Sequence, residues 1–267
     1  MNEPVKANYH THTSHCGHAD GLPFDYAESA VKNGLCKLGF SDHAPFSDRD
    51  YGYRMQYSEL DTYCKEVLQA KQAFSDRIKI FNSLEIEFLP EYTKNQNYYE
   101  YLLNVKKMDY LLCGEHFFRD RNNELHNITS IKKSSLAIDY ALACRNAMHT
   151  GYFKILAHPD IFCINEAWGW NSDYEKAADI IIEGAASTGV LLEFNANGLR
   201  RGIKEYPDGV RFQYPHRRFW QKVKEAGLKA IVGSDAHSPD LIWDKAVTDS
   251  IAMLEEAGIE RVTELSL

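Results

Sequence analysis

Short apolar runs recur along the chain, and a histidine or a carboxylate stands at or just beyond the end of each. The runs cover residues 5–9, 37–41, 78–84, 110–114, 154–157, 190–192 and 229–233. Continuous apolar runs of this length are typical of strands that are buried on both faces of a parallel sheet. The pattern therefore predicts seven buried strands, each delivering a polar side chain at its carboxyl end.

Segments with helical spacing of apolar residues lie between these runs. They cover residues 25–33, 58–74, 134–149, 173–187, 215–225 and 244–256, and a glycine closely follows most of them, which is a common helix stop. The segment 58–74 opens with Ser-Glu-Leu-Asp, the pattern of a capping box. Strand and helix thus alternate about seven times, which predicts a parallel sheet.

The position of the polar residues distinguishes between two parallel architectures. An open doubly wound sheet binds its ligand at a switch point and uses only a few strand ends. Here nearly every strand end contributes, as in a barrel whose loops ring its C-terminal mouth. We therefore expect an α/β fold, a distorted (β/α)7 barrel with the metal site at the C-terminal ends of the strands. The length fits one domain over residues 1–267, and no linker or repeat divides the chain.

Composition narrows the partners and the compartment. A formal net charge of −8 argues against broad binding to nucleic acid or to anionic membranes. Residues 1–9 lack the pattern of a secretory signal and no apolar stretch reaches spanning length, so we expect a cytoplasmic protein. The six cysteines form no Cys-x-x-Cys pair and are interpreted as reduced thiols. Cys16 lies in the histidine-rich first loop, where the histidines are better placed to bind metal.

Histidines and carboxylates near the strand ends form the candidate metal site. His10 and His12 are one residue apart, so on a regular strand they share a face. A lone His-x-His pattern is weak, but seven of the 11 histidines fall at or just past strand ends, which chance does not explain. His126, His149 and His216 fall outside the pattern, and His15 is a less favoured alternative to His18. Imidazole and carboxylate donors together suit zinc, iron and manganese.

Seven motifs occur in order along the chain. They are His-Thr-His at 10–12, Gly-His-Ala-Asp at 17–20, Ser-Asp-His at 41–43, Leu-Glu-Ile-Glu at 84–87, Gly-Glu-His at 114–116, Ala-His-Pro at 157–159 and Gly-Ser-Asp-Ala-His at 233–237. This ordered set resembles the polymerase and histidinol phosphatase (PHP) superfamily over nearly the whole chain. The resemblance implies a distorted (β/α)7 barrel, which agrees with the strand count, and a trinuclear metal site.

The resemblance also implies how three divalent ions are held. The first would be bound by His10, His12, Glu85 and Asp235. The second would be bound by Glu85, His116 and His158, with Glu85 as the bridge. The third would be bound by His18, His43 and His237. The identity of the ions (Zn, Fe or Mn) stays open.

Such a cluster predicts phosphoester hydrolysis. Paired divalent cations generate a hydroxide at neutral pH and neutralise phosphoryl oxygens. The chain has neither a Walker-type loop nor a Gly-x-Ser-x-Gly elbow, so direct hydrolysis by metal-bound hydroxide is the simplest mechanism. Residues 41–45 with 53–55, 84–92, and 193–201 with 214–215 most resemble the histidinol-phosphate phosphatase branch. The resemblance implies hydrolysis of L-histidinol phosphate in histidine biosynthesis.

Several residues are candidates for direct roles in the reaction. Arginine matches phosphate with two parallel hydrogen bonds, and the candidates are Arg200, Arg201 and Arg119, with Arg200 favoured because it follows the sixth strand. Glu85 and Asp235 are assigned to catalysis as metal ligands. Asp42, beside His43, either orients a ligand or protonates the leaving group as a general acid. The same alternatives apply to Glu87 and Glu115.

Two other classes of function remain open from sequence. One is another PHP-type phosphoesterase, either a nucleotide or phosphotyrosine phosphatase or a 3′-exonuclease. The other is a non-catalytic metal-binding domain. The expected partner is a small phosphomonoester, and the acidic total disfavours a nucleic-acid groove. The oligomeric state stays open.

Overall fold

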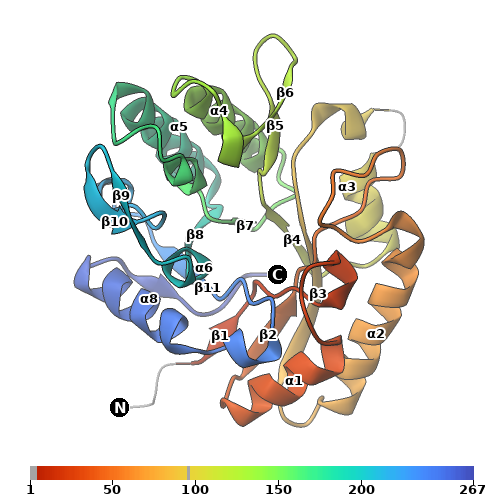
Figure 1. Cartoon of the computed structure of the whole chain (residues 1–267). Helices are drawn as coiled ribbons and strands as arrows, with labels where there is room; N and C mark the ends of the chain where they lie inside the picture. Colours follow the sequence, from red (N-terminus) through yellow and green to blue (C-terminus); the bar gives the residue numbers. More distant parts are fainter. Residues whose placement is uncertain (1–4, 95–96) are drawn as a thin grey trace.

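Eight parallel strands form the central sheet of the computed structural model, which describes residues 5–94 and 97–267 (Figure 1). In sheet order they are β1 (Ala7–Asn8), β2 (Lys37–Phe40), β3 (Lys79–Ile86), β4 (Tyr110–Cys113), β7 (Ile155–Leu156), β8 (Leu191–Asn195), β11 (Ala230–Gly233) and β12 (Arg261–Val262). Sheet order follows chain order, so all carboxyl ends lie along one rim. This confirms the expected distorted barrel and its seven strands. The eighth, β12, was not predicted because residues 261–264, Arg-Val-Thr-Glu, contain no apolar run.

The curled sheet closes at this rim through the segments that follow β1 and β11. Thr11 and Ala236 form an isolated parallel bridge. The His12 N–H donates to the Ala236 carbonyl, and the Asp235 N–H donates to the His10 carbonyl, both at 2.9 Å. At the opposite end of β11, β12 pairs with Ala230 and Ile231 instead. The barrel is therefore closed where the predicted ligands lie.

Helices surround the strands on the outside (Figure 1). The six expected helices are present as α1 (Pro23–Lys32), α2 (Leu60–Ala73), α4 (Leu136–His149), α5 (Ser172–Thr188), α7 (Arg217–Glu225) and α8 (Lys245–Glu256). The capping box expected at Ser58 was wrong, because this residue lies in a 3-10 turn, Tyr57–Glu59, that precedes α2. There the Glu59 carboxylate accepts a hydrogen bond from the Gln56 N–H at 3.3 Å.

Shorter elements fill the loops and were not predicted. Two hairpins, β5 (Phe117–Arg119) with β6 (Leu125–Asn127) and β9 (Ile203–Tyr206) with β10 (Gly209–Phe212), follow β4 and β8. Short helices occur at α3 (Tyr98–Glu100), a π-helical turn Tyr101–Val105, and α6 (Asn197–Arg200). Other 3-10 turns occur at Ser14–Cys16, Pro90–Thr93, Ile128–Ser130, Ile161–Ile164 and Pro239–Leu241. These elements shape the space above the rim.

Part of the N-terminal stretch assessed for a signal, residues 1–4, lies outside the described residues. Within residues 5–94 and 97–267, no helix combines the length and the apolar character needed to cross a bilayer.

A small apolar cluster, distinct from the main core, underlies the rim. It consists of Ala7, Tyr9, Phe81, Tyr110, Leu112, Ile155, Ala157 and Ile231. The Tyr110 hydroxyl donates to the Tyr9 carbonyl at 2.6 Å. Gly39 on β2 leaves room for this contact, since a Cβ there would lie 1.9 Å from the Tyr110 hydroxyl oxygen. The floor of the barrel mouth is therefore a tightly packed aromatic layer.

This packing predicts that Gly39→Ala destabilises the fold by about 1–3 kcal/mol through overpacking. Tyr110→Phe should cost about 1–3 kcal/mol, because it leaves the buried Tyr9 carbonyl unpaired. If the tyrosine hydroxyl causes the clash, the double variant should cost less than the sum of the two by roughly 0.5 kcal/mol or more. Denaturant unfolding of the four proteins measures the cycle. Strictly additive costs would show that Gly39 matters for another reason.

Candidate metal centre

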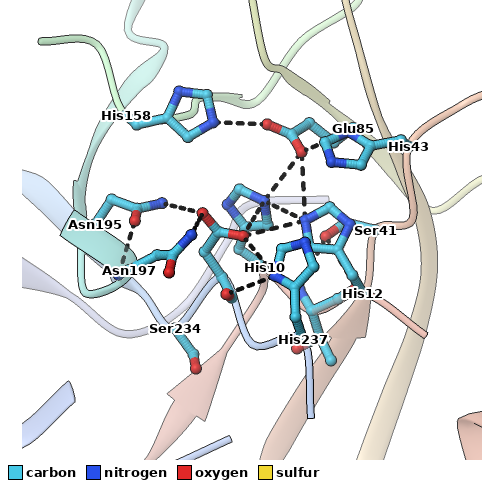
Figure 2. Close-up of polar contacts among 12 residues, drawn as sticks. His10, His12, Ser41, His43, Glu85, His158, Asn195, Asn197, Ser234 and His237 are labelled. Carbon is cyan, nitrogen blue, oxygen red and sulfur yellow. Dashed lines mark hydrogen bonds and ion pairs between the residues drawn. The ribbon is translucent and has the colours of Figure 1, made fainter. Parts of the chain in front are cut away.

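All nine predicted metal ligands meet above the C-terminal rim. Figure 2 shows several of them from different strand ends turned toward Glu85. They are His10, His12, His18, His43, Glu85, His116, His158, Asp235 and His237. These side chains come from six stretches of sequence that lie tens of residues apart, so the parallel barrel itself brings them together.

The first predicted set is arranged like the corners of one coordination shell. The Nε2 atoms of His10 and His12 are 3.0 Å apart, and each lies 3.3 Å from Glu85 Oε2. Asp235 Oδ1 lies 3.3 Å from the His12 nitrogen and 3.7 Å from the His10 nitrogen. Tetrahedral ligands bound at roughly 2.0–2.2 Å are roughly 3.3–3.6 Å apart. These donors therefore fit a single divalent ion.

Glu193 fixes the tautomer of His10. Its Oε1 lies 2.7 Å from His10 Nδ1. A carboxylate that accepts the Nδ1 hydrogen leaves the Nε2 lone pair for a metal. Glu193 Oε2 also accepts from the His158 N–H at 3.1 Å and from Asn195 Nδ2 at 2.8 Å. The sequence placed Glu193 at a strand end but did not assign it this supporting role.

Each oxygen of Glu85 faces a different group of imidazoles. Oε2 faces His10 and His12 and also lies 3.1 Å from His43 Nδ1. Oε1 lies 2.8 Å from His158 Nε2 and 3.7 Å from His116 Nε2. This is the arrangement needed for a carboxylate that bridges two ions.

Two glycines make room for the buried carboxylates. A Cβ at Gly114 would lie 2.0 Å from Glu85 Oε1, and a Cβ at Gly233 would lie 1.7 Å from Glu193 Oε1. Neither glycine has positive φ, so space rather than backbone conformation requires them. Gly114 and Gly233 thus leave space for a carboxylate side chain on the neighbouring strand.

The buried carboxylates and imidazoles of the site shift one another's pKa values. Burial raises the pKa of the Glu85 carboxyl, yet the imidazoles of His10, His43 and His116 hold it well below its usual range. Burial lowers the pKa of His10, but the carboxylates of Glu193, Glu85 and Asp235 raise it to about 10. Buried Glu85 Oε2, His12 Nδ1 and His158 Nδ1 have no hydrogen-bond partner. Cations suit this set of donors.

Two of the predicted ligands have a strained backbone conformation. His158 has φ of 30° and Asp235 has φ of 49°, in the left-handed region that residues with a side chain rarely adopt. Asp235 is held by its neighbours, since its Oδ2 accepts from Asn195 and Asn197 Nδ2, both at 3.2 Å. Such strain concentrates at functional sites.

The third predicted set is only partly assembled. The Nε2 atoms of His18 and His237 lie 2.9 Å apart, and these two side chains group with Cys16. His43 groups with His12 and His237 on one side and with Glu85 and His116 on the other. The trio of His18, His43 and His237 therefore stays a prediction.

Glu87 lies beside the predicted ligand His116 and is paired with Arg54. Both oxygens of Glu87 accept from Arg54, at 2.9 and 3.1 Å, and Oε1 lies 3.4 Å from His116 Nδ1. Burial raises the pKa of Glu87, but Arg54 and His116 lower it to about 2, so it stays charged. This geometry favours an orienting role for Glu87 over that of a general acid.

Asp42 and Glu115 do not line the cavity above the ligands. Asp42 Oδ1 accepts from the Thr13 N–H at 2.8 Å and from its hydroxyl at 2.9 Å. Glu115 Oε2 accepts from the Phe88 N–H at 2.8 Å. The alternative in which Asp42 protonates a leaving group is therefore less favoured than the one in which it holds the loop after His12.

A cavity of about 480 Å³ opens above the ligands. Arg201 and Tyr214 line it, and Arg201 Nε donates to the Tyr214 hydroxyl oxygen at 3.2 Å. Tyr51, Tyr53 and Phe117 line it as well. This volume suits a small molecule.

The three candidate arginines occupy different environments. Arg200, favoured from sequence, is turned away from the cavity and donates to both Asp244 oxygens at 2.9 Å and to the Ser234 carbonyl at 2.6 Å. Arg119 donates to Glu91 at 2.6 and 2.9 Å and lines a separate pocket. The preference for Arg200 needs correction, because its guanidinium is already occupied by protein acceptors. Arg201 is the one that lies at the cavity.

Comparisons with known proteins find relatives that match most of the chain. A probable histidinol-phosphatase of Deinococcus radiodurans is 27% identical over 259 residues, which cover 95% of this chain and 94% of that protein. A histidinol-phosphatase of Bacillus subtilis is 23% identical over 261 residues, which cover 87% and 93%. The crystal structure of histidinol phosphate phosphatase from Lactococcus lactis, complexed with Zn, L-histidinol and phosphate, has a TM-score of 0.74 at 18% identity. It covers 98% of this chain and 99% of its own, a likeness that shows the fold.

The family assignment rests on a model of the PHP domain, which matches residues 8–197. The matched region includes six of the seven motifs and runs from β1 to the start of α6. It covers more than half of the chain, and the ordered ligands and the barrel agree with it. The chain belongs to the PHP domain family.

Proposed function

We propose that this protein is a metal-dependent phosphomonoesterase that hydrolyses L-histidinol phosphate to L-histidinol and phosphate. The observation that carries the proposal is a small cavity with a metal-competent floor and two arginines at its wall, of which Arg54 is paired with Glu87 whereas Arg201 donates to a tyrosine hydroxyl. The full-length relatives named histidinol-phosphatase, and the Lactococcus lactis neighbour crystallised with L-histidinol and phosphate, support this substrate. By the same argument we place the reaction in histidine biosynthesis and the protein in the cytoplasm.

Three sets of side chains would hold divalent ions. We propose His10, His12, Glu85 and Asp235 for the first, and Glu85, His116 and His158 for the second. We propose His18 and His237 for the third, with His43 between it and the bridged pair. When bound, such ions supply an activated water and neutralise phosphoryl charge. The nitrogen and oxygen donors accept Zn, Fe or Mn.

The chain's own residues would bind the two ends of the substrate. Arg201 can donate to a phosphoryl oxygen, and the Tyr214 hydroxyl, which accepts from Arg201, retains its hydrogen to donate into the cavity. Tyr51, Tyr53 and Phe117 form an apolar wall against which an imidazole ring can stack. The phosphate would thus lie over the metal ligands and the alcohol part against the aromatic wall.

Phosphate release from a panel of substrates tests the proposal. The panel contains L-histidinol phosphate, nucleoside monophosphates, phosphotyrosine and short oligonucleotides. We expect kcat/KM to be highest for L-histidinol phosphate. Preferred turnover of another substrate would assign the chain to another PHP-type phosphoesterase. No turnover at full metal occupancy would favour a non-catalytic metal-binding domain.

Glu85→Gln should abolish most activity while the barrel stays folded. An amide lacks the charge of a bridging carboxylate, so we expect kcat to fall by more than the roughly 10- to 100-fold typical of residues that only support a ligand. Metal content by elemental analysis should fall as well. Glu115→Gln is the matched control, because this buried carboxyl does not line the cavity and an amide oxygen can still accept from the Phe88 N–H. Equal, mild effects of both substitutions would remove Glu85 from the bridging role.

His237→Asn should lower the metal content by about one ion per chain, since imidazole donors hold the ion in this kind of site. Turnover should fall in parallel. His149→Asn serves as the control, because this exposed histidine lies at the end of α4, away from the cavity. Elemental analysis that finds the same stoichiometry in both variants would contradict the assignment.

Arg201→Ala should reduce kcat/KM for L-histidinol phosphate by roughly 10- to 100-fold, since one hydrogen bond to a charged group contributes about 1.5–3 kcal/mol. Arg200→Ala should act differently, because it leaves Asp244 without its partner. It should lower the free energy of unfolding, with kcat/KM of the folded fraction changed less than in Arg201→Ala. Steady-state kinetics and denaturant unfolding of both variants separate the two roles. A larger kinetic loss in Arg200→Ala would overturn the placement of Arg201 at the phosphate.

A further inference from the structure

Cys16 is completely buried, although half-buried His15 precedes it and exposed Gly17 follows it in the loop after β1. The 3-10 turn Ser14–Cys16 produces this burial, with the Cys16 N–H donating to the Thr13 carbonyl at 3.1 Å. Gly17 then takes φ of 78°, a conformation that glycine adopts without strain, and this reverses the chain before His18. The turn directs both Cys16 and His18 toward the rim.

His18 and His237 are prepared to bind a cation. His18 Nδ1 lies 3.1 Å from the Cys16 carbonyl, and His237 Nδ1 lies 3.1 Å from the Asp235 carbonyl. A carbonyl can only accept, so each Nδ1 carries the hydrogen and each Nε2 carries a lone pair. These two Nε2 atoms face each other at 2.9 Å. Two lone pairs at this distance repel unless a proton lies between them or a metal ion lies beside both.

The third donor of this group is the Cys16 thiol. One ligand atom each of Cys16, His18 and His237 lies within 4.8 Å of the other two. Cys16 forms no disulfide with any cysteine of the described residues. His43, which the family resemblance assigned to this ion, has its Nδ1 3.1 Å from Glu85 Oε2 and groups with His12 and His237 rather than with His18. The geometry therefore offers sulfur where an imidazole was expected.

We propose that Cys16 binds the third metal ion as a thiolate, together with His18 and His237, and that this subsite selects a thiophilic ion such as Zn²⁺. The proposal rests on the metal-dependent function proposed above. On binding, the S–H bond ionises, its proton leaves to solvent and a metal–sulfur bond forms. Thiolate ligands favour Zn over Mn, whereas the carboxylate-containing sets accept either. Because His18 and His237 also line the cavity, the remaining coordination position would face the substrate.

Cobalt substitution tests this directly. Metal-free protein is loaded with Co²⁺ and its ultraviolet–visible spectrum is recorded. Thiolate coordination gives an intense sulfur-to-cobalt charge-transfer band in the near ultraviolet, which sites with only nitrogen and oxygen donors lack. We expect the band in the unaltered protein. Its absence at a full load of three ions would overturn the proposal, even if no Cys16 variant folds.

Two variants locate the band. Cys16→Ser should remove the band. Cys36→Ser should keep it, because this exposed cysteine lies at the N-terminal end of β2, opposite the rim. Cys16→Ser should also weaken binding of the third Zn²⁺ by at least roughly 10- to 100-fold, the loss typical of a mere supporting residue, and leave Mn²⁺ binding nearly unchanged. A band that persists in Cys16→Ser would overturn the assignment.

Activity measurements on the same samples keep the two proposals apart. Hydrolysis of L-histidinol phosphate without a charge-transfer band would leave the proposed function standing and remove Cys16 from the metal. A band without hydrolysis of any phosphoester would support Cys16 as a ligand and overturn the proposed function instead.

Discussion

A carboxylate with almost no exposed surface, that of Glu85, lies at the centre of the barrel rim, and the structure around it keeps it charged. Burying an ionised carboxylate costs several kcal/mol unless opposite charge or hydrogen bonds compensate. Here four imidazoles within 3.3 Å of its oxygens, from three strand ends, take the place of water. Gly114 on the adjacent strand provides the space that this arrangement requires. Although burial lowers the pKa of His10, the neighbouring carboxylates raise it to about 10, so protonated imidazole supplies part of this compensation, and a bound metal ion would replace the proton.

The closure of the barrel and the construction of the site use the same backbone. The two hydrogen bonds that join the ends of β1 and β11 involve His10, His12 and Asp235, which are also proposed ligands of one ion. The backbone of these three residues therefore cannot shift without disturbing the closure. The strained φ of Asp235 is held from the other side by the amides of Asn195 and Asn197. This coupling explains how strain at two ligands can persist, since the fold fixes them from several directions.

Much of the fold, and the gathering of the candidate ligands at one rim, could be predicted, because both are encoded locally. An apolar run that ends in His or Glu marks a strand and the rim residue after it, and parallel order then gathers the rim residues. The partners of those residues could not be predicted in the same way. Glu193 contacts His10 across 183 residues, a pairing that depends on the tilt of the strands. The choice between Arg200 and Arg201 depends on α6, a single turn, since neighbouring residues on a helix point roughly 100° apart. No apolar pattern identified that turn or the two hairpins.

The charges around the cavity favour a small phosphomonoester over a nucleic acid. Arg54 also lines the cavity, but both oxygens of Glu87 neutralise it, and Arg200 and Arg119 are paired elsewhere. Arg201 donates to a tyrosine hydroxyl rather than to a carboxylate. Among the arginines assigned from sequence, it is thus the cation available to a ligand. A strand of nucleic acid needs a row of cations that follows its repeated phosphates, with bases stacked between them. One available guanidinium above the candidate metal ligands matches one phosphate. The aromatic wall beside it would contact the alcohol part of the substrate, so we expect the alcohol to distinguish one substrate from another.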